Sequence, residues 1–263
     1  MNRIEKAFES GKAFIPFITG GDPDIKTTEK LVLAMADSGA DIIEIGIPFS
    51  DPIAEGNVIR EADERALAGG CTIDGLFDMV KRLRGKTDIP LLFMTYINPV
   101  FVYGKKRFAG MCADCGIDGV IVPDLPFEER AEIAGECADS GVLLISMIAP
   151  TSMERIGEIA RSAEGFLYCV SSLGVTGVRS DIGTGAADMI GEVRKVSNVP
   201  CAVGFGISSP AQAREMAAIS DGVIVGSAIV KIVAEHGRDS LGQVSRFVRE
   251  MKNAVGQAGS RNG

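Results

Sequence analysis

The chain has 263 residues, of which 46% are hydrophobic and 24% charged, proportions typical of a globular protein with a large core. Its formal net charge is −8, because 35 acidic residues outnumber 27 basic ones, and this balance argues against a nucleic-acid-binding protein. A single histidine, His236, argues against catalytic triads and multi-histidine metal sites. Acid–base chemistry is therefore expected from carboxylates, Tyr, Lys or Cys.

The N-terminal segment and the cysteines predict a cytoplasmic protein. Charged residues interrupt the first segment where a signal peptide needs an unbroken apolar run, and no later segment approaches 18 uncharged apolar residues. The six cysteines are dispersed, and only Cys112 and Cys115 form a C-x-x-C pair. One such pair without a second is weak evidence for a metal site, so packed, reduced thiols are expected.

Short runs of apolar and β-branched residues recur along the chain and predict eight strands. They lie at residues 13–18, 41–46, 90–96, 118–123, 142–147, 165–170, 199–204 and 221–226. Most are continuous rather than alternating, which is typical of parallel strands covered by helices. Helical patterns fill the gaps between them. Residues 151–154 predict a capping box before one helix, and Ser209 with Pro210 predicts the start of another.

Strand–helix units repeated eight times in about 250 residues predict the α/β class and one (β/α)8 TIM barrel with extra helical elements. We expect a single domain over residues 1–255 and a frayed tail over 256–263. A doubly wound open sheet is the alternative, but no G-x-G-x-x-G turn follows the first strand. The longest gaps follow the second and sixth strands, and barrel enzymes place their chemistry in such loops.

The second predicted strand contains an acidic residue. Alternation directs Ile43 and Ile45 toward the helices and Glu44 into the barrel. Desolvation there raises the pKa of a carboxyl group toward values useful in general acid–base catalysis. A structural carboxylate held by backbone or hydroxyl donors is the alternative interpretation.

The loop after this strand adds two carboxylates, Asp51 and Glu55, in a segment shaped by two prolines and a glycine. Either residue alone is typical of a helix cap or a solvated charge. Either of them taken with Glu44 makes a site with two carboxylates plausible at the barrel mouth.

Three glycine-bearing loops follow the last three strands, at residues 174–177, 204–208 and 226–228. Glycine lets backbone N–H groups approach an anion closely, and a helix starting near Ser227 directs its positive dipole end to the same place. The set predicts a phosphate site built without lysines.

These motifs together resemble the tryptophan synthase α subunit family, and the resemblance covers nearly the whole chain. The matching strings are FIPFITGGDP at 14–23, EIGIPFSDP at 44–52, MTYINP at 94–99, PDLP at 123–126, GVTG at 174–177, GFGIS at 204–208 and GSAIV at 226–230. The resemblance implies a lyase that cleaves indole-3-glycerol phosphate to indole and glyceraldehyde 3-phosphate by a retro-aldol reaction. It implies no cofactor in this chain.

The resemblance also assigns catalytic roles. Glu44 falls on the acid/base position, which protonates the indole ring carbon and helps to deprotonate the glycerol hydroxyl. The second catalytic position, an aspartate in the family, is Glu55 here, on a stem one methylene longer. Asn57 stands where proline is common, which predicts a looser loop.

The remaining site residues follow from the same resemblance. The indole pocket is expected from Phe17, Met94, Tyr96, Ile121, Pro123, Met147 and Phe205. Tyr168 and Thr176 are expected beside the two carboxylates. The phosphate-binding positions are Gly177, Gly206, Gly226 and Ser227. Apolar residues on strands are core residues by default, so each pocket residue also has a packing interpretation.

The resemblance implies a pyridoxal-phosphate-dependent β subunit as partner, in an α2β2 complex docked partly through the loop after the second strand. Three alternatives stay open at this point. One is another phosphate-binding barrel enzyme, such as an isomerase or indoleglycerol phosphate synthase, although no predicted strand carries a synthase-type lysine. The others are a stand-alone indole-releasing lyase and a non-catalytic regulatory subunit.

Overall fold

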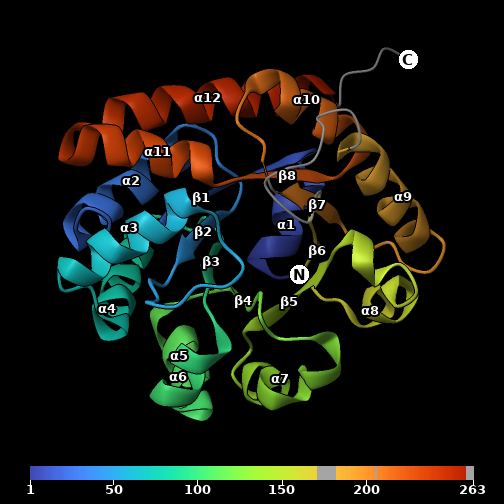
Figure 1. The fold of residues 1–263 in the computed structure, drawn as a ribbon, viewed down its shortest axis with the longest axis horizontal. Coiled ribbons are helices and arrows are strands. Elements are labelled where there is room, and N and C mark those ends of the chain that lie inside the picture. The colour runs from blue at the N-terminus through green and yellow to red at the C-terminus, as the bar shows by residue number, and fades with distance from the viewer. Residues whose placement is uncertain (171–181, 205, 259–263) are drawn as a thin grey trace.

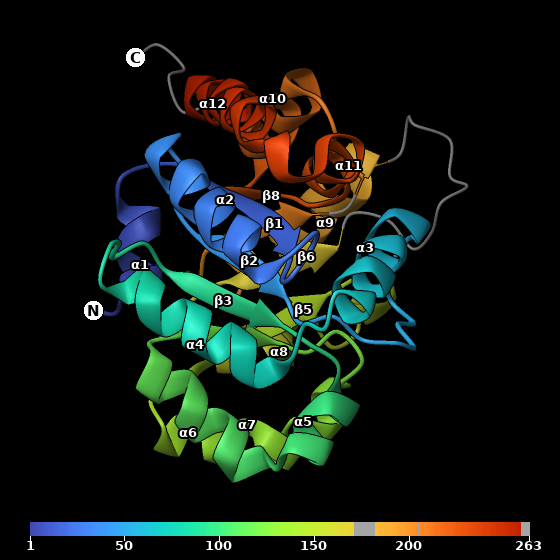
Figure 2. The ribbon, with the colours of Figure 1, turned by 90° about the vertical axis from the view of Figure 1, so that its left-hand side faces the viewer.

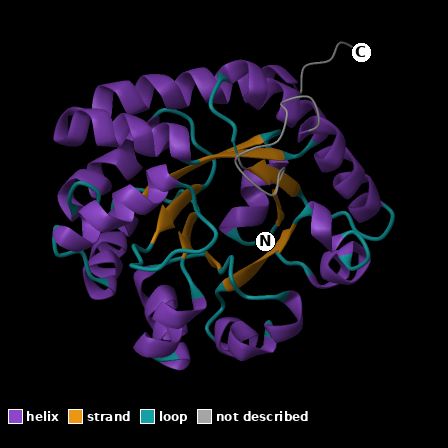
Figure 3. Ribbon diagram, in the orientation of Figure 1, coloured by secondary structure: helices purple, strands orange, loops and turns teal. Residues whose placement is uncertain are grey.

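The computed structural model describes residues 1–170, 182–204 and 206–258. Its described strands form a closed barrel in the order β1 to β8, with every neighbouring pair parallel and β8 paired with β1. Helices surround this ring of strands (Figures 1 and 3). The architecture confirms the predicted TIM barrel and rules out the open sheet.

All eight predicted strands are present, and most are shorter than their apolar runs. They are β1 Ala13–Thr19, β2 Ile43–Gly46, β3 Leu91–Met94, β4 Gly119–Ile121, β5 Leu143–Ile148, β6 Leu167–Val170, β7 Cys201–Gly204 and β8 Gly222–Val225.

The helices of the described chain fall between the strands, with one before β1. They are α1 Arg3–Glu9, α2 Ile25–Asp37, α3 Asn57–Ala68, α4 Ile73–Arg84, α5 Ile97–Tyr103, α6 Lys105–Cys115, α7 Ala131–Asp139, α8 Ile156–Ser162, α9 Ile182–Arg194, α10 Pro210–Ile219, α11 Ser227–His236 and α12 Leu241–Ala258. Three 3-10 turns accompany them: η1 Phe127–Glu129, η2 Pro150–Ser152 and η3 Gly237–Asp239. The long gap after β2 holds both α3 and α4.

Side chains alternate between two cores along each strand. Ile43 and Ile45 pack in the outer core between strands and helices, as the alternation predicted. Ile15, Leu92 and Ile121 pack in a second core inside the barrel. Helix α1 lies at the N-terminal end of the barrel (Figures 1 and 2). It closes this inner core through buried Ile4 and through Phe8, whose ring lies 5.6 Å from that of Phe166. The C-terminal ends of the strands are therefore the end where a ligand can enter.

Two local predictions of helix ends have different outcomes. Ser209 caps α10, accepting from the Gln212 amide, with Pro210 in the first turn as predicted. The capping box at 151–154 is wrong. The Ser152 hydroxyl accepts from the Ala149 amide inside η2, so α8 begins only at Ile156 and has no side-chain cap.

The C-terminal boundary also differs from the expectation. Helix α12 continues to Ala258, and its buried Ala254 and Val255 belong to the apolar face that packs on the barrel. Residues 256–258 are therefore helical rather than part of a frayed tail. The rest of the expected tail, 259–263, lies outside the described residues.

The cysteines are buried and free, Cys112 and Cys115 included, which confirms packed thiols. In the described part of the chain, no group of three His, Cys, Asp or Glu is placed to hold a metal ion. None of the helices described above is long and apolar enough to cross a membrane.

Candidate active site

Glu44 lies on β2 inside the barrel, with only 1% of its surface exposed. It stands in register between Phe17 of β1 and Leu92 of β3, both of which are buried. Neither of its carboxylate oxygens has a hydrogen-bond partner among the described residues. A buried polar group normally finds a partner, so this carboxyl group is an exception that needs a functional reason.

The glycine that ends β2 shapes the space beside Glu44. A Cβ on Gly46 would lie 2.7 Å from the Phe17 ring, so glycine is required for that ring to occupy the mouth. Phe17 packs with Ala62 of α3 and Val230 of α11, and Met94 contacts the same cluster. Two helices thus cover the β1 side of the barrel mouth.

The loop between β2 and α3 carries Glu55 back over this mouth. The Tyr96 hydroxyl accepts a hydrogen bond of 2.9 Å from the amide of Ala54, the residue before Glu55. The Tyr96 ring also lies 5.4 Å from that of Phe49, at the start of the loop. One oxygen of Glu55 is buried without a partner among the described residues. Asp51, the other acidic residue of the loop, is exposed.

A third carboxyl group, Asp63 on α3, completes the cluster. Its side chain is buried, accepts a hydrogen bond from the Phe49 amide and shares one with the Glu55 carboxyl group. The sequence analysis missed this residue. The sequence pattern that could have identified Asp63 is an acidic residue beside Ile59, Ala62 and Ala66. These three apolar residues lie at spacings of three and four, on one face of the helix.

The pKa values of these carboxyl groups are raised by burial. Desolvation, with the nearby charge of Glu55, raises the pKa of Glu44 to about 8. Desolvation and the Glu55 charge likewise raise the pKa of Asp63 to about 8. The pKa of Glu55 is raised by desolvation, while its hydrogen bond with Asp63 opposes the rise. At neutral pH the cluster therefore holds protons that solvent-exposed carboxyl groups would have lost.

Tyr168 lies on β6, across the barrel from β2, and its side chain is near enough to Glu44 to interact electrostatically with it. Its ring occupies the space that a side chain on Gly204 would fill, because a Cβ there would lie 2.7 Å from the hydroxyl oxygen. Burial and the Glu44 charge raise the pKa of Tyr168 well above its ordinary value. Its hydroxyl therefore keeps its proton and can act as a hydrogen-bond donor at the site.

The predicted pocket residues occupy the same end of the barrel. Met94, Ile121, Met147 and Tyr168 belong to the inner core or pack against it, and Phe17 meets Met94 beside them. Tyr96 instead supports the loop that carries Glu55. Phe205 and Thr176, also expected here, lie outside the described residues.

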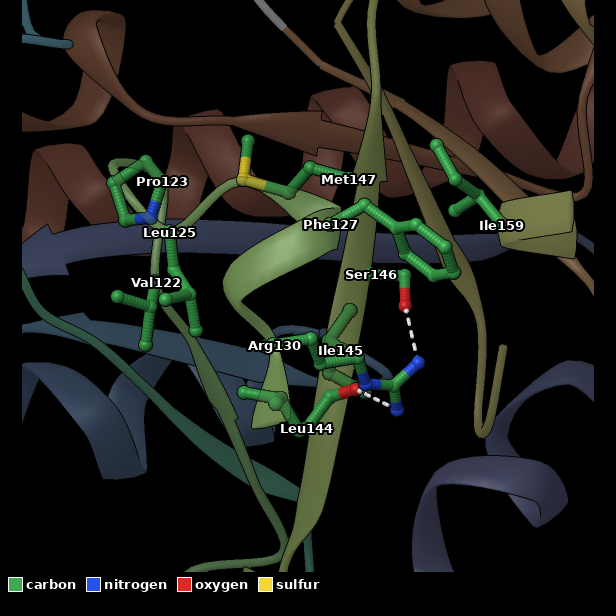
Figure 4. A pocket seen from close by; sticks show the side chains of 10 residues that line it. All are labelled: Val122, Pro123, Leu125, Phe127, Arg130, Leu144, Ile145, Ser146, Met147 and Ile159. Atoms are coloured by element: carbon green, nitrogen blue, oxygen red, sulfur yellow. Dashed lines mark hydrogen bonds between the residues drawn. The ribbon is translucent and has the colours of Figure 1, made fainter. Parts of the chain in front are cut away.

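Pro123 and Met147 line a cavity between β4, β5, η1 and α8 (Figure 4). Arg130 reaches into it, donating hydrogen bonds of 3.2 Å to the Ser146 hydroxyl and 3.3 Å to the Leu144 carbonyl. The cavity measures about 60 Å³, far below the roughly 300–1,000 Å³ of typical ligand sites. It is therefore too small to hold an indole ring alone.

Two of the glycine loops are described, and both lie at the C-terminal ends of their strands. Gly206 has a φ of 73°, in the left-handed region that favours glycine, and its Cβ position is open space. Gly226 precedes α11, which starts at Ser227 as predicted. The first amides of α11 have no partner within the helix and no side-chain cap, an arrangement suited to an anion. Gly177 lies outside the described residues.

Comparison with known proteins identifies the family. The family model described as "Tryptophan synthase alpha chain" matches residues 4–256. The chain belongs to the tryptophan synthase alpha chain family. A tryptophan synthase alpha chain of Thermoanaerobacter pseudethanolicus is 47% identical over 262 residues, covering 97% of this chain and 100% of the relative. That of Lacticaseibacillus casei is 46% identical over 255 residues, covering 97% and 96%.

Solved structures agree with this assignment to the tryptophan synthase alpha chain family. Tryptophan synthase subunit alpha from Legionella pneumophila str. Paris has a TM-score of 0.88 at 36% identity, covering 97% of this chain and 98% of that chain. A chain of tryptophan synthase from Mycobacterium tuberculosis also has a TM-score of 0.88, at 34% identity and with the same coverage of both chains. The resemblance deduced from the sequence motifs is thus confirmed.

Proposed function

We propose that Glu44 and Glu55 carry out the family reaction, the cleavage of indole-3-glycerol phosphate to indole and glyceraldehyde 3-phosphate. The family is that of a carbon–carbon lyase of tryptophan biosynthesis, which argues against the isomerase and synthase alternatives. Indole release by the purified chain distinguishes the lyase from a regulatory subunit. The observation that carries the residue assignment is the Glu44 carboxyl group, buried in the barrel mouth without a partner.

The raised pKa of Glu44, about 8, keeps its carboxyl group protonated at neutral pH. Glu44 can therefore give its proton to the indole ring carbon that bears the glycerol chain. The carboxylate left behind then accepts the glycerol hydroxyl proton as the C–C bond breaks and the aldehyde forms. The enzyme returns to its starting protonation state, as general acid–base catalysis requires.

Glu55 is assigned to the indole N–H, where positive charge develops when the ring carbon is protonated. An ionised carboxylate placed there stabilises that charge most strongly in a site shielded from water. Tyr168 adds a hydroxyl donor that keeps its proton beside Glu44. The apolar side chains of Phe17, Met94, Ile121, Pro123 and Met147 are assigned to the indole ring.

The phosphate group is assigned to backbone amides of the glycine loops at Gly206 and Gly226 and to the first turn of α11 at Ser227. Gly177, Thr176 and Phe205 complete the expected substrate contacts. The family needs no cofactor in this chain, because pyridoxal phosphate belongs to the β subunit. We place this biosynthetic enzyme in the cytoplasm, and none of its described helices is long and apolar enough to cross a membrane.

The partner is the tryptophan synthase β subunit, in an α2β2 complex. Solved relatives include the tryptophan synthase complex of Pyrococcus furiosus, with a TM-score of 0.82 at 33% identity, covering 92% of this chain and 99% of that chain. An apolar groove of about 460 Å³ lies between the loop after β2, the α3–α4 connection and α5. Beside it Ile53 and Val102 are 80% and 82% exposed, values that favour a docking surface.

The residue assignment is tested by indole release from purified protein, alone and with the β subunit. Glu44→Gln keeps the side-chain shape and abolishes proton transfer, while Glu61→Gln removes an exposed carboxylate from α3 as a control. We expect loss of indole release only in Glu44→Gln. Activity of Glu44→Gln within threefold of the parent contradicts the assignment.

Docking is tested with Val102→Asp in the groove and Met153→Asp, a second exposed apolar residue, as a charge-matched control. Val102→Asp is expected to weaken binding of the β subunit by about tenfold or more, because a charge is desolvated in the interface. Equal affinities for both variants, measured by calorimetry, contradict the proposed surface.

A further inference from the structure

Asp63 is not needed for the proton transfers assigned above, yet it is the best-connected acid at the barrel mouth. It accepts from the Phe49 amide, near the start of the β2–α3 loop, and shares a hydrogen bond with Glu55 near its end. Its side chain is buried on α3, a helix fixed by packing of Ala62 on Phe17 of β1. One rigid side chain thus contacts both ends of the loop.

Among the residues that the structure describes, no cation neutralises this acidic pair. Arg65, a basic residue of the same helix, is bound to Asp22, with guanidinium nitrogens 2.8 Å and 3.0 Å from the two carboxylate oxygens. The other groups that face Asp63 are Asp22 and the Cys71 thiol, and Glu55 faces Tyr96 and Glu44. None of these carries a positive charge. Two buried carboxylates in contact cannot both ionise without a cation, so the pair retains a proton.

We propose that Asp63 is a positioning residue that donates a shared proton to Glu55 and holds the β2–α3 loop, and with it Glu55, in its working place. This inference rests on the proposed function of Glu55 and adds a residue to it. It also explains how the chain uses glutamate at a position where the family has aspartate. The longer stem is fixed at its carboxyl end by Asp63.

The direction of the shared proton follows from the environment of each group. Asp63 is the more deeply buried, and its pKa is raised to about 8 by desolvation and by the charge of Glu55. The hydrogen bond opposes the rise of the Glu55 pKa. At neutral pH the proton therefore resides mainly on Asp63, and Glu55 remains an anion available to the indole N–H. Above about pH 8 the proton is lost and the two carboxylates repel each other.

The first test observes the proton without relying on activity. Carboxyl groups labelled with ¹³C are titrated by NMR in the Glu44→Gln background, which removes the other carboxyl group with a pKa near 8. We expect one carboxyl titration above pH 7, its loss on adding Asp63→Asn, and its retention on adding Glu64→Gln, an exposed neighbour on α3. Absence of that titration from the Glu44→Gln background, or its persistence with Asp63→Asn, overturns the proposal.

The second test separates positioning from folding. In the complex with the β subunit, Asp63→Ala is expected to lower kcat by ~10- to 10²-fold with KM within about twofold, because Glu55 is misplaced. Asp63→Asn, whose amide can donate the same hydrogen bond, is expected to restore most of kcat. Equal kcat values for the parent, Asp63→Ala and Asp63→Asn overturn the positioning role. If Glu44→Gln were fully active, the proposed function would fail, and the NMR titration would still decide this inference.

Discussion

The two ends of the barrel treat acidic residues in opposite ways. At the N-terminal end, Asp41, Asp118 and Asp221 lie just before β2, β4 and β8, and each is paired with a cation. At the C-terminal end, Glu44, Glu55 and Asp63 form no ion pair with any residue that the structure describes. The same kind of side chain therefore supports the fold at one end and is left available for chemistry at the other.

Asp118 shows what the N-terminal end does with a carboxylate. One oxygen lies 2.6 Å from Arg84 and accepts from the Leu91 amide at 2.9 Å, and the other lies 3.0 Å from Arg3. The carboxylate thereby joins α1 and α4 to the start of β3. The Asp41 carboxylate likewise joins α12 to β1. It accepts hydrogen bonds of 2.6 Å from the Lys252 ammonium group and from the Phe14 amide. These acids have cationic and amide partners, and they bind elements together.

Glu44 shows the contrast. It is more deeply buried than Asp41 or Asp118, and it has no cation and no hydrogen-bond partner among the described residues. Such a group costs folding free energy, and natural proteins retain such costs mainly at functional sites. The comparison shows that deep burial without a partner distinguishes Glu44 from the partly buried, paired acids of the structural network.

Glu44→Gln, at the C-terminal end of the barrel, is expected to have the largest effect on activity. Indole release should fall by ~10²–10⁴-fold, because the amide cannot transfer a proton. Thermal stability should be equal to that of the parent or higher, since a desolvated ionisable group is replaced by a neutral one. Steady-state assays and calorimetry on the same samples check both expectations, and a large loss of stability would contradict them.

Asp118→Asn is the matching change at the other end. It keeps the shape and removes the charge that pairs with Arg84 and Arg3, so unfolding should become easier by about 3 kcal/mol while kcat stays within about twofold. Asp88→Asn, at a carboxylate that is 96% exposed, is the control and should change neither quantity. A loss of kcat in folded Asp118→Asn would show that the two ends are not separate.

Three substitutions of Glu55 test its role at the C-terminal end of the barrel. Glu55→Gln and Glu55→Ala are expected to lower kcat by about 10²-fold, whereas Glu55→Asp should keep partial activity, because the charge remains and only the reach changes. The shorter carboxylate also loses its contact with Asp63. Indole release at saturating substrate measures all three. Activities equal to that of the parent in every variant would show that Glu55 is inert.

The phosphate site gives the smallest expected effect. Gly206→Asp and Gly206→Ala both place a side chain at a position with left-handed backbone, so both carry the same kind of backbone strain. The Cβ position is open space, and the aspartate variant adds a negative charge. Glycerol 3-phosphate should bind Gly206→Asp about tenfold or more weakly than Gly206→Ala, by like-charge repulsion. Equal affinities in calorimetry would place the phosphate elsewhere.

Most of the fold was predictable from the sequence, because the eight apolar runs and their intervals specify a closed barrel. The direction of Glu44 followed from the alternation of Ile43 and Ile45, and the start of α11 at Ser227 followed from the glycine before it. The false capping box at 151–154 shows the limit of such local patterns. Ser152 has two ways to satisfy backbone groups, and only the tertiary structure decides between them.

Asp63 could not be assigned from sequence because its partners come from distant parts of the loop. Its spacing placed it on the apolar face of α3. An acid at such a position in a sequence is as typical of a solvated charge or a helix cap as of a paired, buried acid. Arg65 of the same helix pairs with Asp22 and not with Asp63, and that pairing follows only from how β1 and α3 pack. The family motifs likewise identify Glu55 without showing what holds its longer side chain.

The most direct test of the contrast between the two ends is the dependence of thermal stability on pH. The pKa of Glu44 is raised from 4.5 to about 8 in the folded protein. Its contribution to stability is therefore fully present below pH 4.5 and is lost progressively as pH rises to about 8, by roughly 1 kcal/mol for each pH unit. The Tm of Glu44→Gln relative to the parent should rise steadily between pH 5 and 8. A difference in Tm that does not change with pH would contradict a protonated, unpaired Glu44.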